Sequence, residues 1–146
     1  QDNNMTITIG CDHAGVDLKK EIIHQINKEH EVFDVGTHNT ESVDYPDIAH
    51  KAINRLLDKK AQRVILLCGS GNGINMTANK HHGVRSALCW TKEIAELARQ
   101  HNDANTIALP ARYLNNEEAI EIVLAFLSVE FEGGRHLNRV NKINCA

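Results

Sequence analysis

Short aliphatic runs alternate with amphipathic segments along the whole chain. Runs rich in aliphatic and β-branched residues predict five strands, which lie at 5–11, 31–36, 63–69, 84–90 and 106–110. Between and after these runs, apolar residues recur at helical spacing, as Leu18, Ile22 and Ile26 illustrate. This spacing predicts helices at 15–29, 46–60, 74–82, 91–101 and 115–130, and a short last helix at 135–144.

Capping residues mark several of the predicted helix ends. Pro46 suits the first turn of its helix, and Thr91 suits an N-cap. Asn115 and Glu118 have the spacing of a capping box. The glycine pair at 133–134 separates the long helix from the last one.

Alternation of strands and helices predicts an α/β fold with a parallel sheet covered on both faces. The uninterrupted run at 63–69 fits a strand buried on both faces. We expect a three-layer, Rossmann-like or flavodoxin-like sandwich with a five-stranded parallel sheet and a C-terminal helix. The common strand order is 2-1-3-4-5. A chain of 146 residues suits one domain spanning 1–146, with residues 1–5 as a loose or tag-derived end.

The carboxyl ends of strands 1 and 3 are the expected ligand site. Ligands of such sheets bind where the strand order reverses, which in the order 2-1-3-4-5 lies between these two strands. The loops that follow them are "CDHAG" at 11–15 and "CGSGNG" at 68–73. The two most unusual loops of the chain are therefore predicted to be neighbours.

The glycine loop matches no nucleotide-binding pattern, because Ile74 stands at the position that decides each one. A dinucleotide fingerprint needs glycine there, and a P-loop needs the glycine that precedes its lysine. A cysteine phosphatase of the C-x5-R type needs arginine there. Three alternate glycines at 69, 71 and 73 can still present backbone N–H groups to a phosphate or an oxyanion. From the loop alone, Cys68 is either a thiolate activated by an electropositive setting or a buried packing residue.

Composition narrows the class of protein. The formal net charge is −3, so no basic excess favours nucleic acid, and no apolar stretch approaches the roughly 20 residues of a membrane helix. The four cysteines lack C-x-x-C spacing, which argues against a zinc ribbon. Reduced thiols and a polar start without a signal-peptide core predict a cytoplasmic protein. We expect Cys11, Cys89 and Cys145 to be structural.

Five separated motifs resemble the family of ribose-5-phosphate isomerase B, which also includes the galactose-6-phosphate isomerase subunits. They are "GCDHAG" (10–15), "DYPD" (44–47), "CGSGNGINMTANK" (68–80), "RQHNDAN" (99–105) and "EGGRHLNRV" (132–140). They occur in the family's order, and the resemblance covers residues 6–140.

The resemblance implies an aldose–ketose isomerase that interconverts ribose 5-phosphate and ribulose 5-phosphate without metal or organic cofactor. The sugar ring opens, and a proton then moves between C2 and C1 through a cis-enediolate. Cys68 would be the base that moves the proton, and His101 the acid/base that opens the ring. The residues implied in substrate contact are Asp12, His13, Gly69, Ser70, Gly71, Asn72, Gly73 and Asn102, with Tyr45 either packing or touching substrate.

Three arginines are implied in phosphate binding: Arg112, Arg135 and Arg139, with His13 assisting. Arg135 and Arg139 lie four residues apart, so on a helix they share a face and could clamp one dianion. One subgroup of the family replaces the cysteine by a glutamate just after the glycine loop. Here that position is Ile74, so the sequence falls with the cysteine type.

The positions of Cys68 and His101 predict a homodimer with active sites between subunits. Cys68 ends a strand, whereas His101 ends a helix and precedes the next strand, so the two fall at opposite edges of the sheet. A partner subunit that places its own His101 over Cys68 resolves this, and members of the family build their sites in that way. Pairing of dimers into a tetramer stays open.

Two alternatives remain at this point. A hexose-6-phosphate isomerase of the same family, acting on allose or galactose 6-phosphate, would use the same chemistry on a longer substrate. A non-catalytic module that binds a sugar phosphate would need neither Cys68 nor His101, and the presence of both argues against it.

Overall fold

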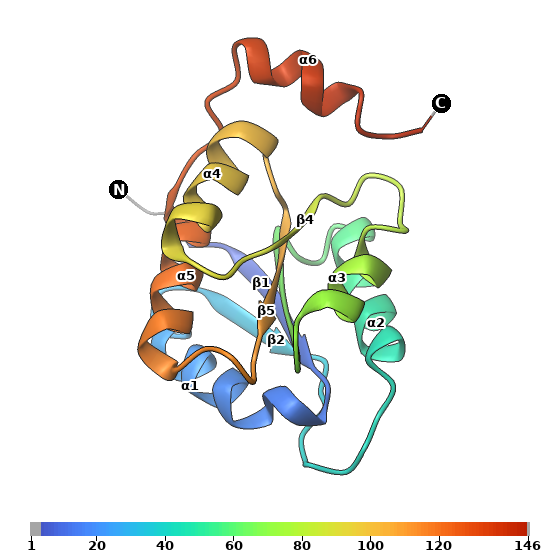
Figure 1. Cartoon of the computed structure of the whole chain (residues 1–146), viewed down its shortest axis with the longest axis vertical. Helices are drawn as coiled ribbons and strands as arrows, with labels where there is room; N and C mark the ends of the chain where they lie inside the picture. Colours follow the sequence, from blue (N-terminus) through green and yellow to red (C-terminus); the bar gives the residue numbers. More distant parts are fainter. Residues whose placement is uncertain (1–3, 146) are drawn as a thin grey trace.

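The computed structural model describes residues 4–145, and Figure 1 shows its course from the first strand to the C-terminal helix. A loose end was expected at residues 1–5, and residues 1–3 of that segment lie outside the described residues. The strands are β1 (Thr6–Cys11), β2 (Glu31–Asp34), β3 (Arg63–Cys68), β4 (Ser86–Leu88) and β5 (Thr106–Pro110). The α-helices are α1 (Val16–Ile26), α2 (Tyr45–Leu57), α3 (Asn72–Ala78), α4 (Lys92–Asn102), α5 (Asn116–Ser128) and α6 (Arg135–Asn141), and a 3-10 turn, η1 (His13–Gly15), precedes α1.

All five strands pair in parallel, in the order β2-β1-β3-β5-β4. The predicted order 2-1-3-4-5 is therefore wrong at its last two places. Helix α3 carries the chain past the position of β5 to the edge strand β4, and α4 then brings it back on the other face. As a result β5, not β4, lies beside β3, and Cys68 is in register with Pro110.

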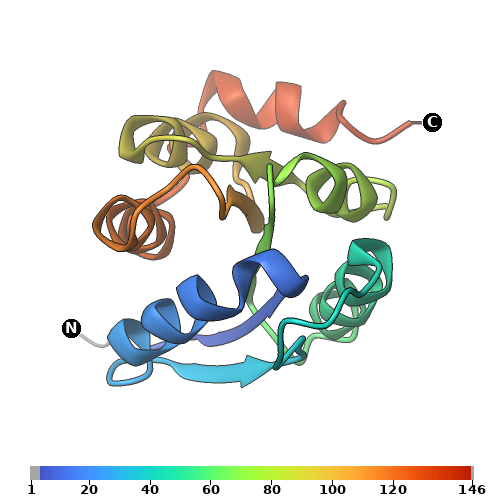
Figure 2. The same ribbon diagram turned by 60° about the horizontal axis from the view of Figure 1, so that its bottom comes forward.

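Helices cover both faces of the sheet. One core cluster unites α1, α4 and α5 with the sheet, around fully buried residues such as Ile22 and Phe126. A second cluster on the other face unites α2 and α3 around Ile53 and Ile74. Figure 2 shows α2 and α3 together on one side, with α4 and α5 on the other. The predicted three-layer α/β sandwich is confirmed.

The helix caps follow the sequence, but helix α3 and strand β4 are shorter than the predicted segments 74–82 and 84–90. The Thr91 hydroxyl accepts a hydrogen bond from the N–H of Ile94, and Asn115 and Glu118 form the capping box. Helix α3 begins two residues before the predicted position, inside the glycine loop. It ends early because the chain turns toward the short strand β4. None of the helices formed by residues 4–145 is both long and apolar enough to cross a membrane.

The outer side of the edge strand β4 is bonded to a side chain. The Asn79 amide nitrogen donates to the carbonyl oxygen of Ser86 over 2.8 Å, and the N–H of Ser86 donates to the Asn79 amide oxygen, also over 2.8 Å. Asn79 therefore imitates a neighbouring strand at this point.

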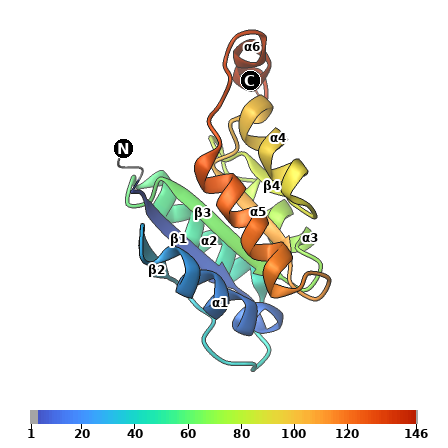
Figure 3. The same ribbon diagram turned by 90° about the vertical axis from the view of Figure 1, so that its left-hand side faces the viewer.

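Helix α6 stands away from the sheet. Figures 1 and 3 show it beyond the end of α4, at the opposite end of the molecule from η1. Gly133 and Gly134, which have φ values of +70° and +54°, join it to the preceding segment. The helix contacts the end of α4 through its buried His136, while Leu137 is 50 % exposed.

Candidate active site

The loops that follow β1, β3 and β5 meet at the carboxyl edge of the sheet. The N–H of Asp12 donates to the carbonyl oxygen of Leu67 over 3.0 Å, which joins the first loop to the end of β3. The N–H of Ala111 donates to the carbonyl oxygen of Cys68 over 2.9 Å, which joins the third loop to the same point. The predicted meeting of the first two loops is confirmed, and the corrected strand order adds a third.

Cys68 lies at the centre of this edge, with 4 % of its surface exposed. Burial raises the pKa of its thiol, while the nearby backbone N–H groups of Ile74, Gly71 and Ser70 oppose the rise. The net direction differs from the expected thiolate-favouring setting, because loss of water outweighs the N–H groups. Of the three loop glycines, Gly71 is the one whose N–H lies near the sulfur, together with the N–H groups of Ser70 and Ile74.

Gly71 gives the loop its sharp turn. Its φ of +76° lies in the left-handed region that favours glycine, and a methyl group here would lie 2.9 Å from the carbonyl carbon of Leu109. This conformation directs the chain into α3, and the N–H of Ile74 in the first turn of that helix lies near Cys68.

Asp12 and His13 form the wall contributed by β1. The Asp12 carboxylate accepts the N–H of Ala14 over 2.9 Å and so caps the short η1 turn. It is buried and close enough to Cys68 to contribute to the raised pKa of the thiol. The Nδ1 atom of His13 accepts a weak hydrogen bond from the N–H of Val43 over 3.4 Å. His13 is thereby linked to the loop that leads into Tyr45.

Tyr45 packs its ring directly against Gly73 in the glycine loop. A methyl group added at Gly73 would collide with the ring carbons of Tyr45 and would lie 2.8 Å from its hydroxyl oxygen. Gly73 is therefore required for space. The tyrosine hydroxyl stands beside the loop, and 39 % of the residue is exposed, so packing and substrate contact are compatible for this side chain.

Arg112 reaches the same edge through β5. Its N–H donates to the carbonyl oxygen of Gly69 over 3.0 Å, and its guanidinium lies so close to Gly69 that an added methyl group would be 2.9 Å from Nη1. In the predicted strand order this loop would have been one strand further from Cys68. The exchange of β4 and β5 is what brings an arginine to the glycine loop.

A buried lysine fixes the backbone behind Asp12. Lys19 has 1 % of its side chain exposed, and its ammonium donates to Asp34 over 2.7 Å and to the carbonyl oxygen of Thr37 over 2.6 Å. The segment that it holds bonds to the end of β1, because the N–H of Cys11 donates to the carbonyl oxygen of Gly36 over 2.7 Å. Sequence reasoning missed Lys19, since a lysine at helical spacing gives no sign of burial.

Four of the predicted site residues lie at the opposite, amino edge of the sheet. His101 and Asn102 end α4, and Arg135 and Arg139 lie on α6. Figure 1 places α6 and the end of α4 at one end of the molecule and η1 at the other. Within residues 4–145 of one chain, these four are therefore not brought together with Cys68.

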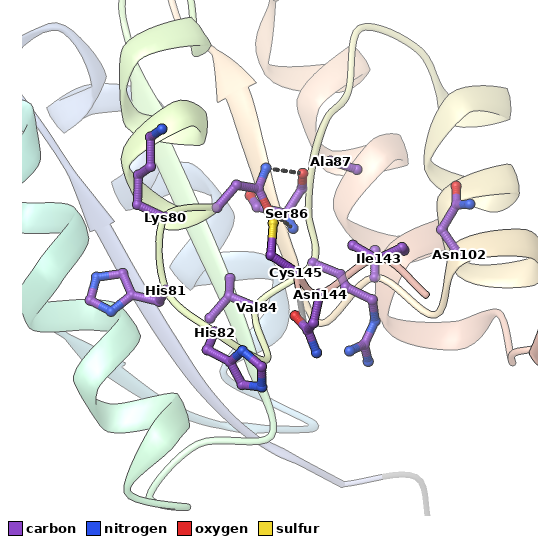
Figure 4. A pocket seen from close by; sticks show the side chains of 13 residues that line it. Lys80, His81, His82, Val84, Ser86, Ala87, Asn102, Ile143, Asn144 and Cys145 are labelled. Atoms are coloured by element: carbon purple, nitrogen blue, oxygen red, sulfur yellow. Dashed lines mark hydrogen bonds between the residues drawn. The ribbon is translucent and has the colours of Figure 1, made fainter. Parts of the chain in front are cut away.

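A cavity of about 570 Å³ opens at this amino edge. Figure 4 shows Asn102 on one side of it, with Lys80, His82 and Asn144 around the opening. Asn102 is the one predicted site residue in its lining. The cavity is thus distinct from the edge that carries Cys68.

His101 is stacked on a second histidine that sequence reasoning did not single out. The rings of His101 and His136 lie nearly parallel, with centroids 4.3 Å apart and planes 14° apart. Glu132 lies 3.5 Å from Nε2 of His136. The only available signal was the position of His136 next to Arg135 in the last motif.

These three side chains are arranged poorly for a metal ion. Ligand atoms of His101, Glu132 and His136 lie within 4.8 Å of one another. An imidazole binds a metal along a lone pair in its own plane, at about 2.0–2.1 Å for zinc. Two stacked and nearly parallel rings direct those lone pairs along separate planes, so they do not converge on one ion.

Comparisons with known proteins agree with the motifs. The family model described as Ribose/Galactose Isomerase matches residues 7–143. Ribose-5-phosphate isomerase B of Escherichia coli is 42 % identical over 138 residues, which cover 94 % of this chain and 93 % of the relative.

Solved structures show the same fold. The ribose 5-phosphate isomerase RpiB of Thermotoga maritima superposes with a TM-score of 0.93 at 46 % identity, covering 95 % of this chain and 97 % of the other. The type B ribose 5-phosphate isomerase of Trypanosoma brucei gives a TM-score of 0.92 at 38 % identity, with 96 % and 97 % covered.

Proposed function

Because the chain belongs to the ribose/galactose isomerase family, we propose that it interconverts ribose 5-phosphate and ribulose 5-phosphate. The observation that carries the proposal is the setting of Cys68. The sulfur is buried at the carboxyl edge, where the nearby backbone N–H groups of Ser70, Gly71 and Ile74 favour its thiolate form against the effect of burial. A group that must take a proton from one carbon and return it to the next needs both the thiol and the thiolate form.

Isomerisation begins with the closed sugar, and His101 is the group that opens it. Its imidazole takes the proton of the C1 hydroxyl and returns a proton to the ring oxygen, so the C1–O ring bond breaks and an aldehyde forms at C1. An imidazole suits this step because it gives and accepts protons near neutral pH.

Proton transfer follows on the open chain. The Cys68 thiolate takes the proton from C2, and the electron pair moves through the C1–C2 bond onto the aldehyde oxygen to give the cis-enediolate. Return of the proton from the Cys68 thiol to C1, with transfer of the C2 hydroxyl proton to the oxygen at C1, completes the ketose. The Ser70 hydroxyl and the loop N–H groups stabilise the charge that develops on the oxygens.

The phosphate is bound at a distance from the reacting carbons. Arg112 lies at the carboxyl edge with Cys68, while Arg135 and Arg139 occupy α6. His13 assists the arginines, and Asp12, Tyr45 and Asn102 contact the hydroxyl groups along the chain of the sugar. Guanidinium groups suit this task because they bind phosphate oxygens in pairs.

The complete site is built by two subunits. Each site combines residues from the carboxyl edge of one subunit with residues from the amino edge of its partner. The first set is Cys68, Tyr45 and Arg112, and the partner subunit contributes His101, Asn102, Arg135 and Arg139. Two-fold symmetry then gives two identical sites per dimer. Two features support this. The two sets lie at opposite edges of one sheet, and large apolar side chains near both edges are about half exposed, among them Trp90 at 46 % and Leu137 at 50 %.

The proposed dimer works in the cytoplasm. Cys11, Cys68 and Cys89 are buried free thiols, which suits a compartment that keeps cysteines reduced.

Steady-state assays test the substrate. Purified protein is offered ribose 5-phosphate, allose 6-phosphate and galactose 6-phosphate in parallel, and kcat/KM is measured for each. We expect the pentose phosphate to give the highest value. Turnover of a hexose phosphate without turnover of ribose 5-phosphate would move the activity to the longer substrate, and absence of turnover with all three would reduce the protein to a binding module.

A further inference from the structure

We propose that His136 is a positioning residue for His101, whose ring it holds in place by stacking at the junction of α4 and α6. The inference rests on the proposed function, because it assigns meaning to the stack through the ring-opening role of His101. His136 itself acts through His101 and needs no contact with the sugar.

The stack is one of three ties between the end of α4 and the segment that leads into α6. The Arg99 guanidinium donates to the carbonyl oxygen of Val129 over 3.0 Å. The N–H of Glu132 donates to the carbonyl oxygen of Gln100 over 3.0 Å. Successive residues of α4 therefore hold successive points of this segment, and the contact of His101 with His136 is the last in the series.

Covalent connection alone does not fix α6. Gly133 and Gly134 precede it directly, and their positive φ values place both in a region that glycine enters freely. His136 and Val140 are the two buried residues of the helix. Of these, His136 is the one that contacts the ring of a proposed active-site residue.

The chemical state of His136 suits a holding role. Burial lowers the pKa of its imidazole, and the neighbouring His101 and Arg135 lower it further, while Glu132 opposes them. A neutral ring can lie flat against His101 and beside two arginines without repelling them. Glu132, 3.5 Å from Nε2, faces the ring edge and limits rotation of the imidazole.

Placement of His101 matters because it must reach a proton on the sugar held by another subunit. General acid–base groups work only within hydrogen-bond reach of the proton that they move. A histidine at the last turn of a helix has freedom to rotate about its side-chain bonds, and the stack removes much of that freedom.

Three substitutions in the full-length protein test the proposal. His136→Ala removes the stacked ring, His136→Phe keeps an aromatic face of similar breadth without a titratable nitrogen, and Asn138→Ala changes an exposed residue of the same helix as a matched control. For each we measure kcat and KM for ribose 5-phosphate, the inhibition constant of inorganic phosphate, the oligomeric state and the thermal unfolding midpoint.

We expect His136→Ala to lower kcat by about 100-fold, as a misplacement of an active-site group by about 1 Å can do, while the inhibition constant of inorganic phosphate stays at the wild-type value. His136→Phe restores most of kcat, and Asn138→Ala resembles wild type throughout. If His136→Ala fails to fold, His136→Gln, which keeps polar bulk without a ring, takes its place.

Three results would overturn the proposal. Unchanged kcat in the alanine variant would remove any role, and a phosphate inhibition constant that worsens in step with kcat would assign His136 to holding the arginines instead. A phenylalanine variant as slow as the alanine variant would exclude stacking. Failure of the proposed function is distinguished from these, because the wild-type protein would then not turn over ribose 5-phosphate at all.

Discussion

Cys68 and His101 lie at opposite edges of one parallel sheet, because Cys68 ends the strand β3 and His101 lies in the last turn of α4, which runs antiparallel to the strands. Neither a rotamer change nor a loop movement joins groups that the length of a sheet separates. The proposed reaction needs both residues, so it requires an assembly in which Cys68 of one subunit meets His101 of another.

Complementation between two inactive variants tests that requirement. Cys68→Ala and His101→Ala subunits are each expected to be inactive as homodimers. A hybrid dimer would hold one intact site, so a mixture refolded together in equal amounts should regain about a quarter of wild-type activity by random pairing. Mixing two preparations of the same variant serves as the control. No recovery in refolded mixtures that contain hybrid dimers would place both groups in one chain.

Removal of the thiol tests the role of Cys68. Cys68→Ala should lower kcat by about 10²–10⁴-fold, the usual contribution of a positioned base, and should leave inhibition by inorganic phosphate unchanged. Cys145→Ala is the matched control, because Cys145 is an exposed free thiol. Near-normal turnover in Cys68→Ala would assign the proton transfer to another group.

The pH profile of the wild-type protein gives a second measure of Cys68. Because its pKa is raised above the ordinary 9.0, the thiolate fraction of the free protein grows as pH rises through and beyond that value. We therefore expect kcat/KM for ribose 5-phosphate to rise with pH across the alkaline range. A limb that levels off well below the ordinary pKa of a thiol would mean that contacts from the partner subunit outweigh burial.

The pH dependence of the free energy of unfolding in the alkaline range should reveal the raised pKa values of the buried cysteines. Burial raises the pKa of Cys89 to about 12 and that of Cys11 to about 11, from 9.0. Folded protein keeps these thiols protonated while unfolded protein ionises them, so stability is complete below pH 9.0 and falls as pH rises from there. Each thiol contributes up to about 1.4 kcal/mol per pH unit to that slope.

Urea unfolding at several pH values measures this slope. Cys89→Ala should show a shallower decline of the free energy of unfolding above pH 9.0 than wild type, whereas Cys145→Ala should follow wild type. Equal slopes in all three proteins would show that Cys89 is solvated in the folded state.

The contact of Tyr45 with Gly73 predicts that the effect of Gly73→Ala on the free energy of unfolding changes sign when Tyr45 is removed. In the presence of Tyr45, Gly73→Ala should destabilise the protein by about 1–3 kcal/mol, the usual cost of overpacking. In a Tyr45→Ala background the methyl group has space, and an alanine in helix α3 should be neutral or stabilise by up to about 1 kcal/mol relative to glycine. Urea unfolding of the four proteins gives the coupling, and additive effects would refute the contact.

The sequence predicts the carboxyl edge better than it predicts what surrounds that edge. Runs of aliphatic and β-branched residues identified all five strands, and the general rule for switch points brought the loops after β1 and β3 together. The exchange of β4 and β5 in the strand order could not be predicted, because the alternation of strands and helices along the chain does not specify which strands pair. Arg112 therefore had a predicted role but no predicted neighbour.

The direction of the Cys68 pKa and the stack on His101 were missed for a related reason. Burial of a thiol depends on every layer that covers it, so the loop glycines alone suggested the opposite direction. The contact between His101 and His136 crosses 35 positions of sequence and two glycines, where local patterns give no information.

The bonds between Asn79 and Ser86 also limit how copies of this protein can meet. A strand arriving at the outer side of β4 would need the backbone groups of Ser86, and the Asn79 amide already occupies both of them. Such edges are otherwise templates for runaway strand addition. The Asn79 side-chain amide thus blocks strand addition at Ser86 and with it fibril-like growth along this edge. Association at β4 then depends on side-chain contacts, which can be specific for one partner.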